Sequence, residues 1–351
     1  MVTKIIKIDE FDAKSIAELE FAANVIRSGG LVIFPTETVY GLGADAVRSE
    51  CVKKIYEAKG RPSDNPLIIH VASADDAEKY AYTNEVYYRI ADRFMPGPIT
   101  VILPSKEIVP LTTRGGLDTV AVRCPENIIA RRLISLSGTA IAAPSANISG
   151  TPSPTSASHV INDMTGRVDV IIDGGDSEIG LESTIVKIEN DGTLTLLRPG
   201  KITVDELLGV VSEVAIADAV TDELKDNEKA LSPGMKYKHY APKAELILID
   251  ADNKSFVDYV KNNVSKSDAV ITYSENISKI SPVMDFDDIY DFGSELNSAQ
   301  QAHRLFDILR KTDIKPYTRI LAPLPGKSGI GLALYNRMIR AAAHKIIDLR
   351  R

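Results

Sequence analysis

The sequence is poor in the residues that build disulfide frameworks and metal centres. It holds only two cysteines, Cys51 and Cys124, and five histidines, and none of them pair at the spacing of metal ligands. No stretch approaches the roughly 20 consecutive apolar residues that cross a bilayer. The alternating start, residues 1–8, predicts a strand and not a signal peptide. We therefore expect a soluble, cytoplasmic protein without a disulfide framework or a zinc site.

Positive charge is also in short supply. The 41 lysines and arginines are outnumbered by 48 aspartates and glutamates, which gives a net charge of −7. This balance argues against bulk nucleic-acid binding and leaves room for a local basic pocket. The chain is long enough for two domains. Its acidic, aperiodic stretch from residue 211 predicts a linker, so we expect domains at 1–210 and 244–351 joined by residues 211–243.

Strands and helices alternate along both domains. In the first we expect helices at 12–28, 49–58, 74–82, 84–94, 127–137, 155–164 and 204–210, and strands at 31–34, 67–71, 99–103, 119–124, 141–143, 168–172, 183–189 and 193–198. In the second we expect strands at 245–249, 269–273, 288–292 and 318–322, and helices at 254–263, 298–311 and 330–346. The second pattern predicts a small open sheet with helices on its faces.

The stretch 59–70 forms a rigid corner between a helix and a buried strand. Ser49 is the expected N-cap of this helix, and Gly60 suits a left-handed C-terminal cap. Lys59 and Arg61 therefore leave the helix end on either side of a glycine. Lysine as a point charge and arginine as a fork both suit phosphate oxygens.

Small polar side chains and further cations lie at other strand ends. Ser145 and Asn147 follow a strand, where backbone N–H groups and small side chains can hold phosphate or a hydrated Mg²⁺. Arg123 and Arg198 each end a predicted strand, and Ser183 begins one. Their joint placement predicts a pocket that binds a nucleotide and a small anionic substrate.

Other catalytic patterns are absent or incomplete. Ser145 lacks the glycines of a nucleophile elbow, and we expect a structural role for Glu37, the one carboxylate of interest in the candidate loops. The run GLGADA at 41–46 resembles a dinucleotide fingerprint, but six residues separate it from the preceding strand. The run GKS at 326–328 resembles the end of a Walker A loop, but Leu321 stands where its first glycine belongs.

Longer motifs resemble those of the threonylcarbamoyl-AMP synthases, the YrdC-like family, in their long two-domain form. The family's KxR and SxN patterns stand at 59–61 and 145–147, and PTETVYGLG stands in full at 35–43. STIV at 183–186, LRPG at 197–200, the linker segment SPGMKYKHYAP at 232–242 and the C-terminal block match as well. The resemblance covers essentially the whole chain.

This resemblance implies a twisted mixed-sheet α/β catalytic domain with a deep, positively charged cavity, followed by a small Rossmann-like α/β domain. It implies a nucleotidyltransferase that makes L-threonylcarbamoyl-adenylate and pyrophosphate from L-threonine, bicarbonate or CO₂, and ATP with Mg²⁺. A separate transferase complex would then pass the threonylcarbamoyl group to the adenosine beside the anticodon of tRNA. The composition and charge, in turn, lead us to expect no membrane partner and no bulk nucleic-acid binding.

The family's site residues carry over position by position. Thr36, His70, Arg123 and Ser183 would hold L-threonine, with Arg123 pairing its carboxylate. The ATP site would be lined by Lys59, Arg61, Ser63, Asn65, Thr119, Ala143, Ser145, Asn147, Ser153 and Arg198, with Gly234 and Tyr237 of the linker closing over the nucleotide. Lys59, Arg61, Ser145 and Asn147 would be catalytic. Mg²⁺ would be held mainly by the ATP phosphates.

Two alternatives remain open at this point. An RNA-binding module could use the basic cavity, but the sequence offers neither RNP-type aromatics nor a basic helix. A carbamoyl-transfer enzyme that matures hydrogenases has a related domain, but it needs acylphosphatase and zinc-finger segments that this sequence lacks. The linker is expected to act as a lid, because the carbamate intermediate is labile in water. For residues 244–351 we expect a regulatory, docking or lid-anchoring role.

Overall fold

The computed structural model describes residues 2–222 and 240–350. The described residues fold as two compact units: residues 2–149 with 153–222 form unit 1, and residues 150–152 with 240–350 form unit 2. Gly234 and Tyr237, the linker residues of the predicted ATP site, lie outside the described residues. The predicted lid and the predicted domain boundaries at 211 and 243 therefore stay predictions.

Unit 1 is built on one mixed sheet, which has 11 strands in the described residues. The strands are β1 (Lys4–Lys7), β2 (Val32–Phe34), β3 (Gly41–Asp45), β4 (Ile68–His70), β5 (Ile99–Pro104), β6 (Thr119–Arg123), β7 (Ile141–Ala142), β8 (Val170–Asp173), β9 (Thr184–Ile188), β10 (Leu194–Arg198) and β11 (Val214–Ile216). Their order across the sheet is β1-β8-β2-β3-β7-β4-β6-β5-β9-β10-β11. Parallel and antiparallel pairs alternate irregularly, which confirms the predicted mixed sheet.

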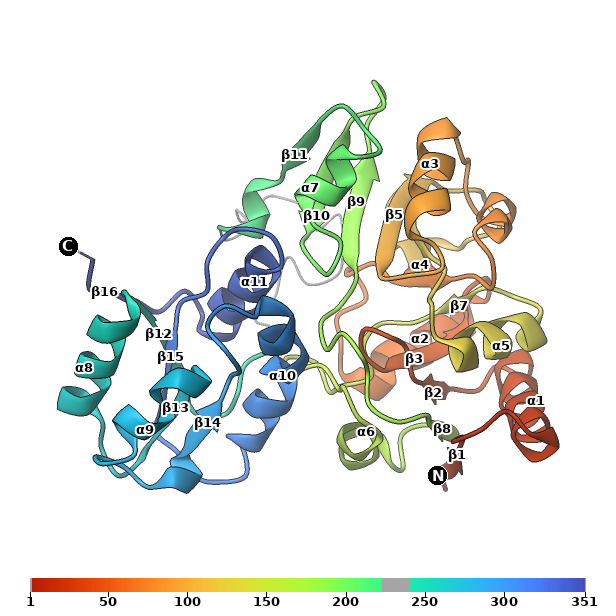
Figure 1. Cartoon of the computed structure of the whole chain (residues 1–351). Helices are drawn as coiled ribbons and strands as arrows, with labels where there is room; N and C mark the ends of the chain where they lie inside the picture. Colours follow the sequence, from red (N-terminus) through yellow and green to blue (C-terminus); the bar gives the residue numbers. More distant parts are fainter. Residues whose placement is uncertain (1, 223–239, 351) are drawn as a thin grey trace. The chain divides into compact units, whose positions relative to one another are not determined.

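Helices cover this sheet with their apolar faces. They are α1 (Ala13–Arg27), α2 (Ser49–Lys59), α3 (Glu85–Phe94), α4 (Leu111–Arg114), α5 (Ile128–Ser137), α6 (Ala157–Met164) and α7 (Val204–Leu208). α1 and α5 pack together over β1, β2, β7 and β8 (Figure 1). Leu19 and Ile26 of α1 meet Leu133 of α5 in that core, because apolar residues recur at helical spacing along both helices. α2 packs against β3 and α4.

Four local features of unit 1 differ from the sequence prediction. Residues 41–45 form strand β3, although the sequence predicted no helix or strand between residues 34 and 49. The glycines allow close packing there: a Cβ on Gly43 would lie 2.8 Å from the Phe34 ring. Arg48, and not Ser49, takes the N-cap position of α2, and the Ser49 hydroxyl instead accepts a hydrogen bond from Thr112. A short 3-10 helix replaces the helix predicted at 74–82. β11, within the predicted linker, extends the sheet beside β10.

Unit 2 has an all-parallel sheet among its described residues. Its strands are β12 (Glu245–Asp250), β13 (Asp268–Thr272), β14 (Ile289–Asp291), β15 (Arg319–Pro323) and β16 (Ile346–Asp348), in the order β14-β13-β15-β12-β16. Its helices are α8 (Asn253–Asn263), α9 (Ile277–Ile280), α10 (Ser298–Lys311) and α11 (Gly331–Ala341). The predicted small Rossmann-like sheet is confirmed.

The apolar pattern of the sequence did not predict where the last helix of unit 2 ends. The predicted helix over 330–346 stops at Ala341, because Ala343 and His344 adopt positive φ values of 47° and 60° and reverse the chain into β16. In both units, no helix within the described ranges has the length and apolar character needed to cross a membrane.

Candidate functional site

The first polar group of unit 1 is centred on Lys59, the last residue of α2. Gly60 follows in the left-handed conformation, with φ 61°, as its sequence position predicts. The turn directs the Lys59 side chain inward, where it is 2% exposed. Its ammonium donates hydrogen bonds to the carbonyl oxygens of Ser145 at 2.5 Å and Asn147 at 2.6 Å. The KxR and SxN motifs are therefore in direct contact.

The residues around Lys59 fix the loop that follows β7. The Ser145 hydroxyl donates to Asn147 Oδ1 at 2.5 Å, and the Ala146 amide donates to the Tyr40 carbonyl at 2.8 Å. Arg61 folds back on its own loop and donates through Nη2 to the Pro66 carbonyl at 3.2 Å. We call Lys59, Arg61, Ser145 and Asn147 the Lys59 group.

The second polar group is centred on Arg123, the last residue of β6. Arg123 Nη2 lies 2.6 Å from Glu37 Oε1 in an ion pair whose side chains are 5% and 4% exposed. His70 ends the neighbouring parallel strand β4 and is paired in register with Arg123. Both strands place these last side chains on the same edge of the sheet. Glu37 is thus a partner of Arg123, a contact that the sequence pattern did not reveal.

His70 is buried and electrically neutral. Burial, with a smaller contribution from the nearby Arg123 cation, lowers the pKa of His70 to about 3. The ring meets Phe34 edge to face at a centroid distance of 6.1 Å. Three buried polar atoms near these two groups find no hydrogen-bond partner within the described residues: His70 Nδ1, Glu37 Oε2 and Asn65 Oδ1. Such atoms point to a ligand that supplies hydrogen-bond partners, because unpartnered buried polar atoms are rare in folded proteins.

Ser183 and Arg198 extend the second group across β9 and β10. The Ser183 and Thr100 hydroxyls lie 2.7 Å apart, and Arg198 donates to the Ser183 carbonyl at 3.0 Å and to its hydroxyl at 3.1 Å. Arg198, assigned by sequence to the ATP site, therefore lies beside a residue assigned to threonine. We call Glu37, His70, Arg123, Ser183 and Arg198 the Arg123 group.

The two groups flank the short strand β4. At its start, the Ile68 carbonyl accepts from the amide of Ala143, which leads into Ser145. At its end lies His70, about 7 Å further along at the usual rise of a strand. The loop 35–40 touches both groups, through Glu37 on Arg123 and through Tyr40 on Ala146. This arrangement can hold an elongated anionic ligand together with a small carboxylate.

The remaining predicted residues are less closely tied to either group. Thr36 is buried, and its hydroxyl contacts Thr38 and the Val39 carbonyl within the loop. Ser63 is exposed, whereas Thr119 is half-buried at the start of β6. Ser153 is fully buried and donates to Glu182 at 2.6 Å. Sequence reasoning missed Glu182 and set Glu37 aside, although each lies beside or within a recognised motif.

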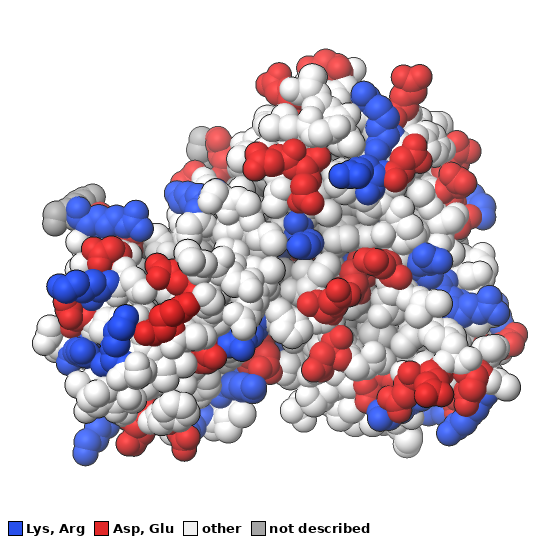
Figure 2. All heavy atoms as spheres, viewed as in Figure 1, with Lys and Arg blue, Asp and Glu red and all other residues white. Residues whose placement is uncertain are grey.

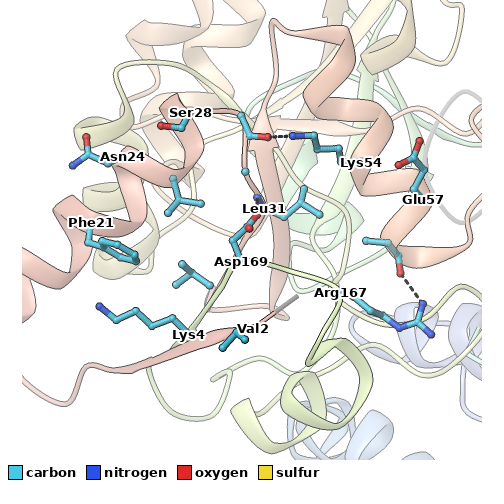
Figure 3. A pocket seen from close by; sticks show the side chains of 15 residues that line it. Val2, Lys4, Phe21, Asn24, Ser28, Leu31, Lys54, Glu57, Arg167 and Asp169 are labelled. Carbon is cyan, nitrogen blue, oxygen red and sulfur yellow. Dashed lines mark hydrogen bonds between the residues drawn. The ribbon is translucent and has the colours of Figure 1, made fainter.

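A separate groove of about 910 Å³ opens beside β1 and α2. Figure 3 shows Lys54 reaching the Gly29 carbonyl and Arg167 reaching the Ala58 carbonyl at this groove, at 2.6 Å and 3.4 Å. These two cations are therefore engaged with backbone oxygens. None of the predicted site residues lines this groove.

Comparisons with known proteins bear on both units. Residues 24–200 match the family described as "Telomere recombination", which groups Sua5, YciO and YrdC, and residues 202–343 match "Threonylcarbamoyl-AMP synthase, C-terminal domain". The chain is similar to the threonylcarbamoyl-AMP synthases of Pyrococcus abyssi (44% identity, 95% of this chain and 96% of the relative) and Bacillus subtilis (41%, 93% of each). It is also similar to the crystal structure of P. abyssi Sua5 complexed with L-threonine, with a TM-score of 0.90 and 43% identity over 99% of this chain and 100% of that one.

Proposed function

This chain belongs to the threonylcarbamoyl-AMP synthase family, and we propose that its two buried polar groups make L-threonylcarbamoyl-adenylate and pyrophosphate from L-threonine, bicarbonate and ATP. This is the first step of the threonylcarbamoyl modification of tRNA adenosine beside the anticodon. We place this reaction at the two groups because the Lys59 group and the Arg123 group lie at the two ends of β4. One end offers cations and hydroxyls for phosphates, and the other offers a guanidinium for a carboxylate.

We assign L-threonine to the Arg123 group. The Arg123 guanidinium receives the α-carboxylate, because an arginine fork matches a carboxylate in geometry and charge. His70 and Ser183, with Thr36 of the neighbouring loop, surround the rest of the amino acid. The relative bound to L-threonine supports this choice of ligand, since it aligns with this chain over nearly its full length.

We assign ATP to the Lys59 group. Lys59 holds the loop 145–147 in place and places a buried positive charge beside it. Arg61 and the Ser145 hydroxyl then face the phosphates, with Asn147 and Asn65 as further polar contacts. Ser63, Thr119, Ala143 and Ser153 complete the proposed lining, and Arg198 lies where the two ligands meet.

The chemistry needs positioning and charge stabilisation. Threonine and bicarbonate form a carbamate, whose oxygen attacks the α-phosphorus of ATP and expels pyrophosphate. The carbamate is already a nucleophile, so no side chain has to become covalently attached. Cations fixed beforehand stabilise the charge that develops on the phosphates, which is the largest contribution expected in such a site. Buried surroundings protect the labile carbamate from water.

Magnesium fits this donor set as an ion carried by ATP. Within the described residues, no three His, Cys, Asp or Glu side chains come together in a metal-binding group. Mg²⁺ commonly binds through substrate phosphates and retains several waters. The unpartnered oxygen Asn65 Oδ1 and the Ser145 hydroxyl would support such a hydrated ion. When bound, the ion would neutralise phosphate charge.

Partners and location complete the proposal. A separate transferase complex takes the threonylcarbamoyl group to tRNA, and the enzyme works in the cytoplasm, where its buried Cys51 and Cys124 remain free thiols. Figure 2 shows basic and acidic side chains interspersed on one face of the molecule, without a continuous basic surface there. That face therefore offers no continuous basic surface of the kind that RNA binding uses.

Pyrophosphate release tests the proposal. Wild-type protein with ATP and Mg²⁺ should release pyrophosphate only when both L-threonine and bicarbonate are present. Release that ignores threonine would overturn the synthase assignment. Dependence on carbamoyl phosphate would favour the carbamoyl-transfer alternative, and tight binding of structured RNA without any release would favour the RNA-binding module.

A further inference from the structure

Glu37 carries one engaged and one unengaged carboxylate oxygen in the interior of unit 1. Oε1 accepts from Arg123 Nη2 at 2.6 Å, whereas Oε2 is buried and has no hydrogen-bond partner within the described residues. The side chain is 4% exposed, so water does not readily serve Oε2. A buried carboxylate oxygen without a donor is costly, and its persistence indicates that a ligand supplies the donor.

The neighbourhood of Oε2 defines the kind of donor. His70 Nδ1, on the strand that pairs with the strand of Arg123, is a second buried polar atom without a hydrogen-bond partner among the described residues. Arg123 itself has five N–H donors, of which the Glu37 contact and a 3.4 Å contact to the Gly97 carbonyl use two. The cluster therefore offers acceptors on one side and spare donors on the other. A zwitterionic amino acid complements it, with its carboxylate on Arg123 and its ammonium on Glu37.

We propose that Glu37 Oε2 binds the α-ammonium of L-threonine and accepts one of its protons as the carbamate forms. This inference rests on the proposed synthase reaction. The threonine nitrogen forms a bond to the bicarbonate carbon, and the bond from that carbon to its hydroxyl oxygen breaks. Of the three ammonium protons, one stays on nitrogen, one leaves with the hydroxyl as water, and one moves to Glu37. The carboxylate becomes a carboxylic acid, and charge balances.

His70 is a poor candidate for the proton acceptor. His70 stays neutral at physiological pH, because burial and the Arg123 cation lower its pKa to about 3. A side chain with so low a pKa holds a proton poorly. His70 then serves as a hydrogen-bond partner of the substrate.

The test compares two directions of the reaction in Glu37→Gln and Glu37→Asp. The forward direction, pyrophosphate release from ATP, L-threonine and bicarbonate, needs the ammonium to lose a proton. The reverse direction, ATP formation from L-threonylcarbamoyl-adenylate and pyrophosphate, starts with that nitrogen already acylated. We expect E37Q to slow the forward reaction by about 100-fold or more, the usual scale of acid–base catalysis. We expect the reverse reaction to fall far less, and E37D, which keeps a carboxylate, to recover part of the forward rate.

A binding measurement distinguishes a loss of recognition of the threonine amine from a general loss of folding. The wild type should prefer L-threonine over 2,3-dihydroxybutyrate, which has a hydroxyl in place of the amine, and E37Q should lose this preference. Asp268→Asn is the matched control, because Asp268 is 1% exposed and lies 2.6 Å from Arg319 in unit 2. D268N breaks an ion pair of the same length and should keep the wild-type ratio of forward to reverse rates.

The outcomes are distinct. Equal losses in both directions, with the amine preference intact, would give Glu37 a purely structural role and overturn the inference. If E37Q does not fold, the same ratio measured on E37D decides: a selective forward loss supports the inference and an equal loss overturns it. A wild type that releases no pyrophosphate with threonine would overturn the proposed function instead.

Discussion

The Lys59 ammonium donates a 2.6 Å hydrogen bond to the carbonyl of Asn147, across 88 residues of sequence. The backbone repeats the link, since the Ser149 amide donates to the Lys59 carbonyl at 2.9 Å. The two motifs therefore form one structural element, and Lys59 serves both the shape of the site and its charge. Substitutions at Lys59 should reveal both roles.

Lys59→Ala should lower stability and abolish pyrophosphate release together. The change leaves the buried carbonyls of Ser145 and Asn147 without this donor, a loss of about 1–3 kcal/mol. Urea unfolding measures the first effect and pyrophosphate release the second. Lys54→Ala is the matched control, because Lys54 lies on the same helix and donates to the Gly29 carbonyl at 2.6 Å. If K54A and K59A behaved alike, Lys59 would have no special role.

Arg123→Met should destabilise the protein strongly. It leaves the Glu37 carboxylate buried without its partner, and breaking a buried ion pair in this way costs about 3–5 kcal/mol. The double variant R123M/E37Q should recover much of that loss, because the uncompensated charge is gone. It should not recover the affinity for L-threonine, which needs the guanidinium. Urea unfolding and threonine titration check the two expectations, and a double variant as unstable as R123M would contradict the first.

The local pattern of the sequence predicted most of the fold for a physical reason. Helices such as α5 and α10 show apolar residues at helical spacing and have polar caps, so their bounds follow from the sequence. β3 was missed because glycines are typical of loops, whereas its pairing with β7 joins segments that lie far apart in the sequence. The end of α11 was missed because two residues at positive φ carry no signal in their residue type.

The site could be predicted less completely than the fold. Motifs brought Lys59 and Ser145 forward, but only the folded chain shows that the Lys59 ammonium holds the loop. Glu37 was set aside because a lone carboxylate in a loop has no periodic signature. Its importance to the site becomes visible only through its ion pair with Arg123, which lies 86 residues away in the sequence. Long-range pairing of this kind is fixed by strand order, which local patterns do not encode.

His70 should make stability depend on pH. The pKa of His70 in the folded protein, about 3, lies below the ordinary histidine value of 6.5, so the unfolded chain binds the proton more tightly. The contribution of His70 to the free energy of unfolding therefore keeps its full value above pH 6.5. It falls as the pH drops toward 3, by up to about 1.4 kcal/mol per pH unit. Urea unfolding between pH 7 and pH 4 should show this slope, and His70→Gln should reduce it. His303→Gln, at an exposed position, should keep it. An unchanged slope in H70Q would contradict the assignment.

Gly200→Ala should weaken threonine binding although Gly200 touches no proposed ligand. A Cβ at this position would lie 2.5 Å from the Thr184 amide nitrogen and 2.8 Å from the Glu182 carbonyl, the two neighbours of Ser183. The backbone around Ser183 must then shift, at a cost of about 1–3 kcal/mol. We expect a higher KM for L-threonine in pyrophosphate release and a lower midpoint of unfolding in urea.

Gly192→Asn is the control in the same hairpin. Gly192 has φ 84°, which asparagine tolerates, and a Cβ there would have its nearest contact 3.5 Å away. A threonine KM raised equally in G192N and G200A would show that hairpin stability, and not the position of Ser183, controls binding.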